Sequence, residues 1–199
     1  HTAAYPDAEG VDSFSGDSWH GTRWNHKVDL QDKRVAIIGS AASAIQIVPE
    51  LAKQVAHLTV LQRTPNWIMA RGRKFYSKNL INLFNWLPGL VNVYRRLQAY
   101  MMSFTVEGVT LGHKRMDQFE KMARDYLHEV IKDPDLRETL TPKSRYGCKR
   151  GLVSDDFYPA LLRDNVDLVA EGLKAVRPQG ITTVSGLEID VDVIIYCTG

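Results

Sequence analysis

Cysteine is scarce in this sequence, and the motifs of several enzyme classes are missing. The two cysteines, Cys148 and Cys197, lie far apart, which predicts a reducing, cytoplasmic compartment and no disulfide framework. No Gly-x-Ser-x-Gly, His-Glu-x-x-His, Cys-x-x-Cys or P-loop pattern occurs, so hydrolase, metalloprotease and kinase interpretations have no support. No cysteine or second histidine stands at ligand spacing to His20, and we therefore expect no metal site.

The sequence also lacks an excess of positive or negative residues, and it has no long apolar run. Lys and Arg total 25 against 23 for Asp and Glu, a near balance that predicts no nucleic-acid partner. There is no signal peptide and no apolar run of about 18 residues, so we expect a soluble chain without membrane contact. The 199 residues are 44% apolar, enough for a core. Because the chain starts without Met and stops directly after an apolar run, we expect a fragment.

The stretch from Arg34 to Ala44 predicts a buried strand, a tight turn and the start of a helix. Val35, Ile37 and Ile38 form the short apolar run of a parallel strand covered on both faces. Gly39 permits a sharp turn. The apolar residues after it recur at the spacing of a helix with one apolar face: Ala44, Ile45, Val48, Leu51 and Ala52. A second strand over 58–61 completes a βαβ-like unit.

The turn has small residues where a pyrophosphate would approach the backbone. The dinucleotide fingerprint G-x-G-x-x-G/A is matched as Gly39-x-Ala41-x-x-Ala44, with Ser40, Ala42 and Ser43 between. We interpret these residues as a cofactor-binding turn at a helix N-terminus. The alternative is an α/β protein that binds no nucleotide.

The end of the second strand favours NADP over NAD. An NAD site places Asp or Glu there to hold the ribose 2′-hydroxyl, but this strand is followed by Gln62-Arg63-Thr64. Arg63 and the Thr64 hydroxyl suit a 2′-phosphate. The alternative is a solvated arginine.

Before this unit comes the pattern Phe14-x-Gly16-x-x-x-His20-x-x-x-Trp24. Its glycines and aromatics predict an irregular but packed segment. The pattern resembles the fingerprint of type I Baeyer–Villiger monooxygenases, and further matches follow in that family's order: Gly39–Ala44, Gln62–Trp67, Gly147–Arg150, Asn165–Val169 and Asp192 through Thr198-Gly199. Two residues depart from the family pattern, Asn25 for Pro or Asp and Ala41 for Gly.

The resemblance implies an NADPH- and FAD-dependent enzyme that oxidises a ketone to an ester or lactone with O₂. It implies that Lys149 is a second phosphate contact and that Arg150 is the active-site arginine, whose charge would stabilise the reduced flavin. Thr198 and Gly199 would lead back to an FAD domain, most of which this chain lacks. Two alternatives stay open: a flavin monooxygenase that oxygenates nitrogen or sulfur, and a non-catalytic dinucleotide-binding fragment.

The predicted fold is α/β, a Rossmann-like NADP-binding domain with a parallel sheet and a mainly helical insertion. Residues 1–30 are a linker with the fingerprint, 31–74 and 141–199 form the NADP-binding domain, and 75–140 form the insertion. Within the insertion we expect a helix break at Pro88-Gly89 and a helix end at Asp133-Pro134. Its apolar stripes should pack between helices; the alternative is contact of Trp86–Met102 with a membrane surface or an apolar substrate entrance. After the insertion we expect a helix over 155–163, a strand over 166–169, a hairpin over 174–183 and a last strand over 191–196.

Overall fold

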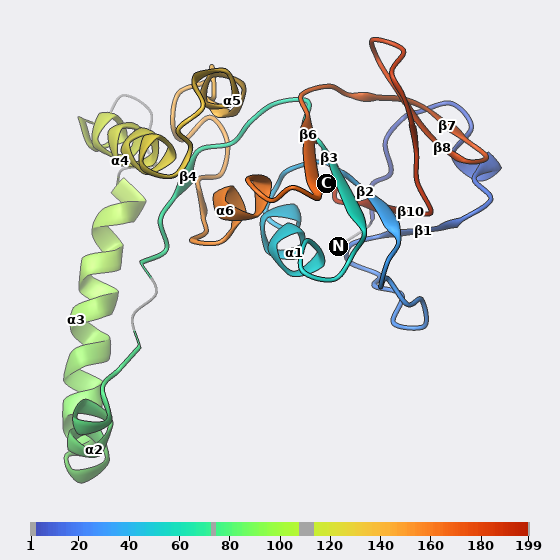
Figure 1. The fold of residues 1–199 in the computed structure, drawn as a ribbon. Coiled ribbons are helices and arrows are strands. Elements are labelled where there is room, and N and C mark those ends of the chain that lie inside the picture. The colour runs from blue at the N-terminus through green and yellow to red at the C-terminus, as the bar shows by residue number, and fades with distance from the viewer. Residues whose placement is uncertain (1–2, 73–74, 108–113, 199) are drawn as a thin grey trace.

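The centre of the chain is a parallel sheet. The computed structural model describes residues 3–72, 75–107 and 114–198. All neighbouring strands of the five-stranded sheet are parallel, and their spatial order is β1 (Asp17–His20), β10 (Val193–Tyr196), β2 (Arg34–Ile38), β3 (His57–Leu61) and β6 (Val166–Val169). Their carboxyl ends consequently meet at one edge (Figure 1), the edge at which open α/β sheets bind ligands.

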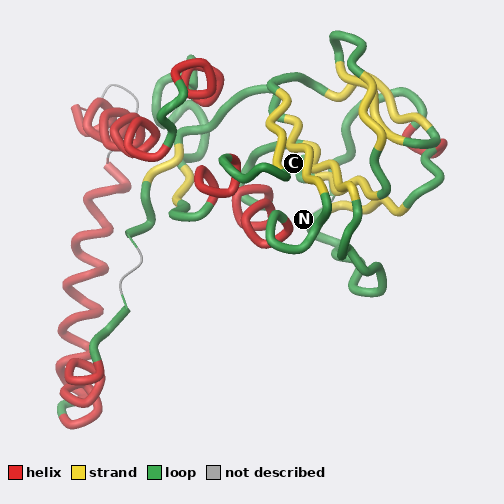
Figure 2. Tube along the Cα trace, viewed as in Figure 1, coloured by secondary structure: helices red, strands yellow, loops and turns green. Residues whose placement is uncertain are grey.

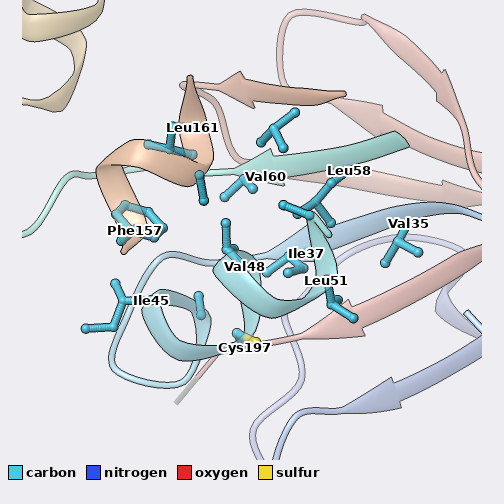
Figure 3. Close-up of a cluster of buried hydrophobic side chains, with 14 of the residues drawn as sticks. Val35, Ile37, Ile45, Val48, Leu51, Leu58, Val60, Phe157, Leu161 and Cys197 are labelled. Carbon is cyan, nitrogen blue, oxygen red and sulfur yellow. The ribbon is translucent and has the colours of Figure 1, made fainter. Parts of the chain in front are cut away.

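Each face of this sheet is covered by a different layer. On one face, α1 (Ala44–Leu51) and α6 (Phe157–Leu161) pack on the odd-numbered side chains of β2 and the even-numbered ones of β3. Figure 3 shows Ile37, Val48 and Val60 in this layer. On the other face lies an antiparallel sheet of β7 (Leu173–Arg177), β8 (Gly180–Thr183) and β9 (Glu188–Asp190), beside the short helix η1 (Val11–Ser13). Burial on both faces explains why β2 and β10 are apolar at nearly every position.

The insertion consists of helices that differ in how they meet the sheet domain. In order they are α2 (Lys78–Trp86), α3 (Pro88–Glu107), α4 (Lys114–Val130) and α5 (Pro134–Leu140). The α2–α3 pair extends away from the sheet, whereas α4 and α5 lie near a small parallel pair, β4 (Ile68–Met69) and β5 (Leu152–Val153) (Figures 1 and 2). No helix within the described ranges is long and apolar enough to span a bilayer.

Most of the expected elements are confirmed. The parallel α/β class, the strand–turn–helix at 34–51, the helix break before Pro88, the strand Val166–Val169 and the hairpin of β7 and β8 all occur. The Asp133-Pro134 pair also starts a helix, because the Asp133 carboxylate caps α5 by accepting from the N–H groups of Asp135 and Leu136. The helix expected over 155–163 is shorter, Phe157–Leu161.

The expectation of irregular backbone around the fingerprint was wrong in one part. Residues Asp17–His20 form β1, the edge strand, which pairs in parallel with β10. Its partner is so distant in the sequence that no local pattern could reveal the pairing. The short strands β4 and β5 were missed for the same reason; β9 was missed too, although it pairs with the nearby β8. The proposed division into linker, domain and insertion stays a prediction.

Candidate functional site

The turn after β2 depends on a glycine. Gly39 has φ +106°, a conformation that side chains disfavour. A Cβ at this position would lie 2.8 Å from the carbonyl oxygen of Cys197, which follows β10. The Gly39 N–H donates to the carbonyl of Leu61 at 2.9 Å. Gly39 therefore lets β2 turn while three neighbouring strands stay in contact at their carboxyl ends.

Beyond Gly39 the turn leaves backbone donors open. Helix α1 begins at Ala44, and the side chain of its N-cap residue, Ser43, makes no capping bond. Among the described residues, no acceptor faces the N–H groups of Ala41, Ala42 or Ser43. Free donors and the positive end of the helix dipole favour an anion. Ala44 is fully buried against the sheet, whereas the Ala41 methyl is exposed at the turn.

The loop after β3 is tied to this turn. The Asn66 side-chain amide donates from Nδ2 to the carbonyl oxygen of Ser40 at 3.1 Å. Gln62, at the end of β3, is buried, and its Nε2 has no partner among the described residues. The sequence placed both residues in a matching motif but did not reveal that Asn66 joins the two loops.

Two residues predicted to contact a phosphate meet in space. Lys149 Nζ donates to Thr64 Oγ1 at 2.7 Å, although 84 residues separate them in the chain. Arg63 precedes Thr64, and its aliphatic part lies near Gly172, just after β6. Arg63, Thr64 and Lys149 are all exposed, and neither cation pairs with a carboxylate in the described part of the chain. The site thus has uncompensated positive charge beside an open helix N-terminus.

Helix α4 holds the loop that carries Lys149. The Glu120 carboxylate accepts from the N–H of Tyr146 at 2.8 Å and pairs with Arg145 Nε at 3.0 Å. Tyr146 is buried against Phe119 and Trp67, and Trp67 Nε1 donates to the carbonyl of Ser144 at 2.8 Å. Burial raises the pKa of the Tyr146 hydroxyl. Sequence reasoning missed this function of the insertion because the contacts join separate segments.

The fingerprint residues line the edge strand β1. A Cβ on Gly16 would lie 2.4 Å from the carbonyl oxygen of Asp192 and 2.8 Å from the Phe14 ring, so only glycine fits between them. The Asp192 carboxylate accepts from the Arg34 N–H at 2.8 Å, and its bonds with Arg34 hold its pKa below the usual range. The Trp24 ring meets that of Trp19 edge-on at 5.7 Å. These contacts fix how the chain enters and leaves β1 and β10.

His20 joins the ends of β1 and β10. It is buried, and its Nδ1 accepts from the N–H of Thr22 at 3.2 Å. Its Nε2 lies 2.6 Å from the carbonyl oxygen of Thr198, so Nε2 carries the proton and donates. Burial raises the pKa of the Cys197 thiol to about 12. Gly199 lies outside the described residues.

Arg150 is placed apart from these contacts. It is exposed, and no hydrogen bond or ion pair with another described residue holds its guanidinium. The structure therefore brings together the Gly39–Ala44 turn, Arg63, Thr64 and Lys149 at the carboxyl edge, with His20 and Thr198 at the neighbouring strand ends. The role of Arg150 stays a prediction.

Comparison with known proteins gives consistent matches over nearly the whole chain. The model of the flavin-binding monooxygenase-like family matches residues 3–199. A Baeyer–Villiger monooxygenase of Pseudomonas aeruginosa is 39% identical over 198 residues, which are 100% of this chain and 38% of that protein. One of Streptomyces coelicolor is 41% identical, over 98% of this chain and 37% of that protein. The chain thus spans well under half the length of these relatives.

Solved structures agree with these relatives. A crystal structure of OTEMO in complex with FAD and NADP superposes with a TM-score of 0.79 at 28% identity, covering 100% of this chain and 45% of that one. Cyclohexanone monooxygenase from Rhodococcus sp. Phi1 bound to NADP⁺ superposes with a TM-score of 0.80 at 24% identity, covering 98% of this chain and 44% of that one. The second likeness concerns the fold alone.

Proposed function

Because this chain belongs to the flavin-binding monooxygenase-like family, we propose that it is the NADPH-binding part of a flavin-dependent Baeyer–Villiger monooxygenase. The complete enzyme would convert a ketone to an ester or lactone with O₂. The observation that carries the NADPH assignment is the Lys149–Thr64 bond of 2.7 Å beside Arg63. It supports a phosphate site where an NAD enzyme would have a carboxylate. We also propose a cytoplasmic location, supported by the two free cysteines.

The residues of the turn fit the pyrophosphate of the cofactor. The open N–H groups of Ala41, Ala42 and Ser43 would donate to it, and Gly39 allows the backbone of the turn to approach closely. The ribose 2′-phosphate would lie near Arg63, Thr64 and Lys149. A phosphate carries about −1.5 to −2 charge at neutral pH, so one guanidinium and one ammonium would nearly neutralise it.

The flavin, when bound, would supply the oxygen chemistry. We assign to Arg150 the task of placing a fixed positive charge near the FAD. The absence of a carboxylate partner for its guanidinium among the described residues supports this assignment, because no anion of this part of the chain neutralises its charge. A fixed cation in a dry site contributes roughly 10²-fold in rate. In the complete enzyme, Arg150→Ala should abolish oxygenation and leave NADPH binding largely intact; near-normal product formation would refute the assignment.

The test of cofactor choice is titration of the complete protein with NADPH and NADH. One charge-assisted hydrogen bond contributes about 1.5–3 kcal/mol, so NADPH should bind at least ~10-fold more tightly than NADH. Arg63→Ala should remove this preference while the NADH affinity changes little. Lys33→Ala is the matched control, because Lys33 is exposed just before β2 at the opposite edge of the sheet. Equal affinity of the unmodified protein for both cofactors would refute the site.

The two other functions predict different products. A flavin monooxygenase acting on nitrogen or sulfur would give an N-oxide or sulfoxide from an amine or thioether and leave a cyclic ketone unchanged. A non-catalytic dinucleotide-binding protein would bind NADPH and give neither product. Product analysis with a cyclic ketone and a thioether separates the three. The match to two Baeyer–Villiger monooxygenases at 39% and 41% identity favours the lactone.

A further inference from the structure

Helices α2 and α3 form a hairpin that extends away from the sheet domain (Figure 1). No side chain of α2 is buried. The two helices meet through an aromatic cluster, in which the Phe84 ring lies 6.1 Å from Tyr76 and 5.8 Å from Tyr94 between ring centroids. The hairpin therefore holds itself together through this cluster, independently of the sheet domain.

The face of α3 that carries Tyr94 also has exposed apolar side chains. Leu90, Val93, Leu97 and Met101 follow one another at spacings of three or four residues, so they share one face of α3. They are 38%, 64%, 55% and 60% exposed. Near the turn between the helices, Trp86 is 77% exposed. An exposed helix face of a soluble domain is ordinarily polar, so this stripe indicates a binding surface.

The charge of the hairpin is mainly positive. From residue 51 to residue 106 the sequence contains no Asp or Glu, and Glu107, the last residue of α3, is the one acidic residue of the two helices. Lys78, Arg95 and Arg96 are exposed on the hairpin and have no carboxylate partner among the described residues. The basic residues Arg71, Arg73 and Lys74 precede it in the sequence. A second copy of the same hairpin offers only Glu107 against Lys78, Arg95 and Arg96, so the charge disfavours self-association.

We propose that the α2–α3 hairpin is a peripheral contact with anionic phospholipid. Exposed Trp, Leu and Val side chains together with Lys and Arg are the combination by which a helix lies in the headgroup region of a bilayer. Trp86 and the Leu90–Met101 stripe would enter the interface, and Lys78, Arg95 and Arg96 would meet the lipid phosphates. The proposal adopts one alternative left open by the sequence and is independent of the proposed enzymatic function.

The test is partitioning of the complete protein onto vesicles. Phosphatidylcholine vesicles with 30% phosphatidylglycerol should bind the protein, and vesicles of phosphatidylcholine alone should bind it much more weakly. The fluorescence of Trp86 is the difference between the emission of the unmodified protein and that of Trp86→Phe. This emission should shift to shorter wavelength when anionic vesicles are added. Raising the salt concentration should weaken binding, since salt screens exposed charges.

Paired variants separate the apolar and charged contributions. Arg95→Gln/Arg96→Gln should weaken partitioning about 30-fold, the equivalent of about 2 kcal/mol at two basic residues, whereas Lys27→Gln/Lys33→Gln should not. Leu97→Ser should reduce binding, and Val184→Ser, at a residue 65% exposed directly after β8, should not. Absence of vesicle binding would overturn the proposal. Trp86 emission that is already at short wavelength without lipid would also overturn it, because another surface of the protein would then cover the stripe. Dimerisation that depends on protein concentration and disappears in Leu97→Ser would overturn it too, because a second copy would then cover the stripe.

Discussion

The sheet domain and the α2–α3 hairpin use apolar residues in opposite ways. In the sheet, Ile37, Leu58 and Ile195 are completely buried between two covering layers. In the hairpin, Val93, Leu97 and Trp86 are more than half exposed. Similar residue types thus form a core in one region and a surface in the other. The difference lies in whether a second layer packs on the helix or strand, and composition cannot reveal that.

The two regions therefore have different proposed functions, cofactor binding in the sheet domain and surface binding in the hairpin. The sheet domain owes its stability to the burial of apolar side chains. The candidate site lies at the edge of the sheet, where the positions of its residues depend on how the sheet and its covering helices pack. The hairpin contributes little to that packing, so its outer side chains can serve binding. Substitutions in the first region should change stability and cofactor affinity together. Those in the second should change neither.

The largest expected effect is in the core. Ile37→Ala removes a side chain that is buried between β2 and α1 (Figure 3) and should lower the free energy of unfolding by about 2–5 kcal/mol. Leu97→Ala, in the exposed stripe of α3, should change it by less than about 0.5 kcal/mol. Urea unfolding midpoints of the two variants measure the contrast. Comparable losses would mean that the hairpin is part of the cooperative core.

The next largest effect on stability is expected from replacing a glycine of the turn, compared with a glycine of α3. Gly39→Ala adds a Cβ 2.8 Å from the Cys197 carbonyl oxygen at φ +106°, which should cost about 1–3 kcal/mol and weaken NADPH binding. Gly89→Ala, in α3, meets no atom within 4 Å and should be neutral or stabilise by up to about 1 kcal/mol. Thermal denaturation and NADPH titration of both variants are the measurements. A stable, NADPH-binding Gly39→Ala protein would contradict the close packing of the turn.

The third effect concerns alkaline pH. Burial raises the pKa of Cys197 from 9.0 to about 12, so the folded protein favours the protonated thiol. The contribution of this thiol to the free energy of unfolding is intact below pH 9 and is lost as the pH rises from 9 towards about 12. The loss is at most about 1.4 kcal/mol per pH unit. Cys197→Ala should flatten the fall of stability between about pH 9 and 10. Cys148→Ala, at an exposed cysteine, should leave the slope unchanged; equal slopes in all three proteins would exclude the effect.

The smallest effect concerns the contact of α4 with the loop of Lys149. Glu120→Gln weakens the acceptor shared by Tyr146 N and Arg145 Nε, and the loop should become less well positioned. We expect NADPH affinity to fall about 3–10-fold, equivalent to about 1 kcal/mol. Lys121→Gln, which removes an exposed ion pair on the same helix, should have no effect on affinity. Unchanged affinity in Glu120→Gln would show that the loop is held without α4.

Prediction from the sequence was most successful where the pattern is local. The run Val35–Ile38, the glycine after it and the helical spacing from Ala44 are confirmed, because a buried parallel strand and an amphipathic helix each leave a periodic signal. The strand Asp17–His20 was missed, because two of its residues are exposed and its partner follows 176 positions later.

The sequence by itself determined the α/β class, the glycine turn, the basic residues after the second strand and, through its motifs, the family. Only the tertiary structure decided that Lys149 reaches Thr64, that Glu120 of the insertion holds the Tyr146 loop, and that the apolar stripe of α3 faces outward. The physical reason is the range of the interactions. Periodicity and turn chemistry act over a few residues, whereas a hydrogen bond across 84 residues and the exposure of a helix face depend on how whole layers pack.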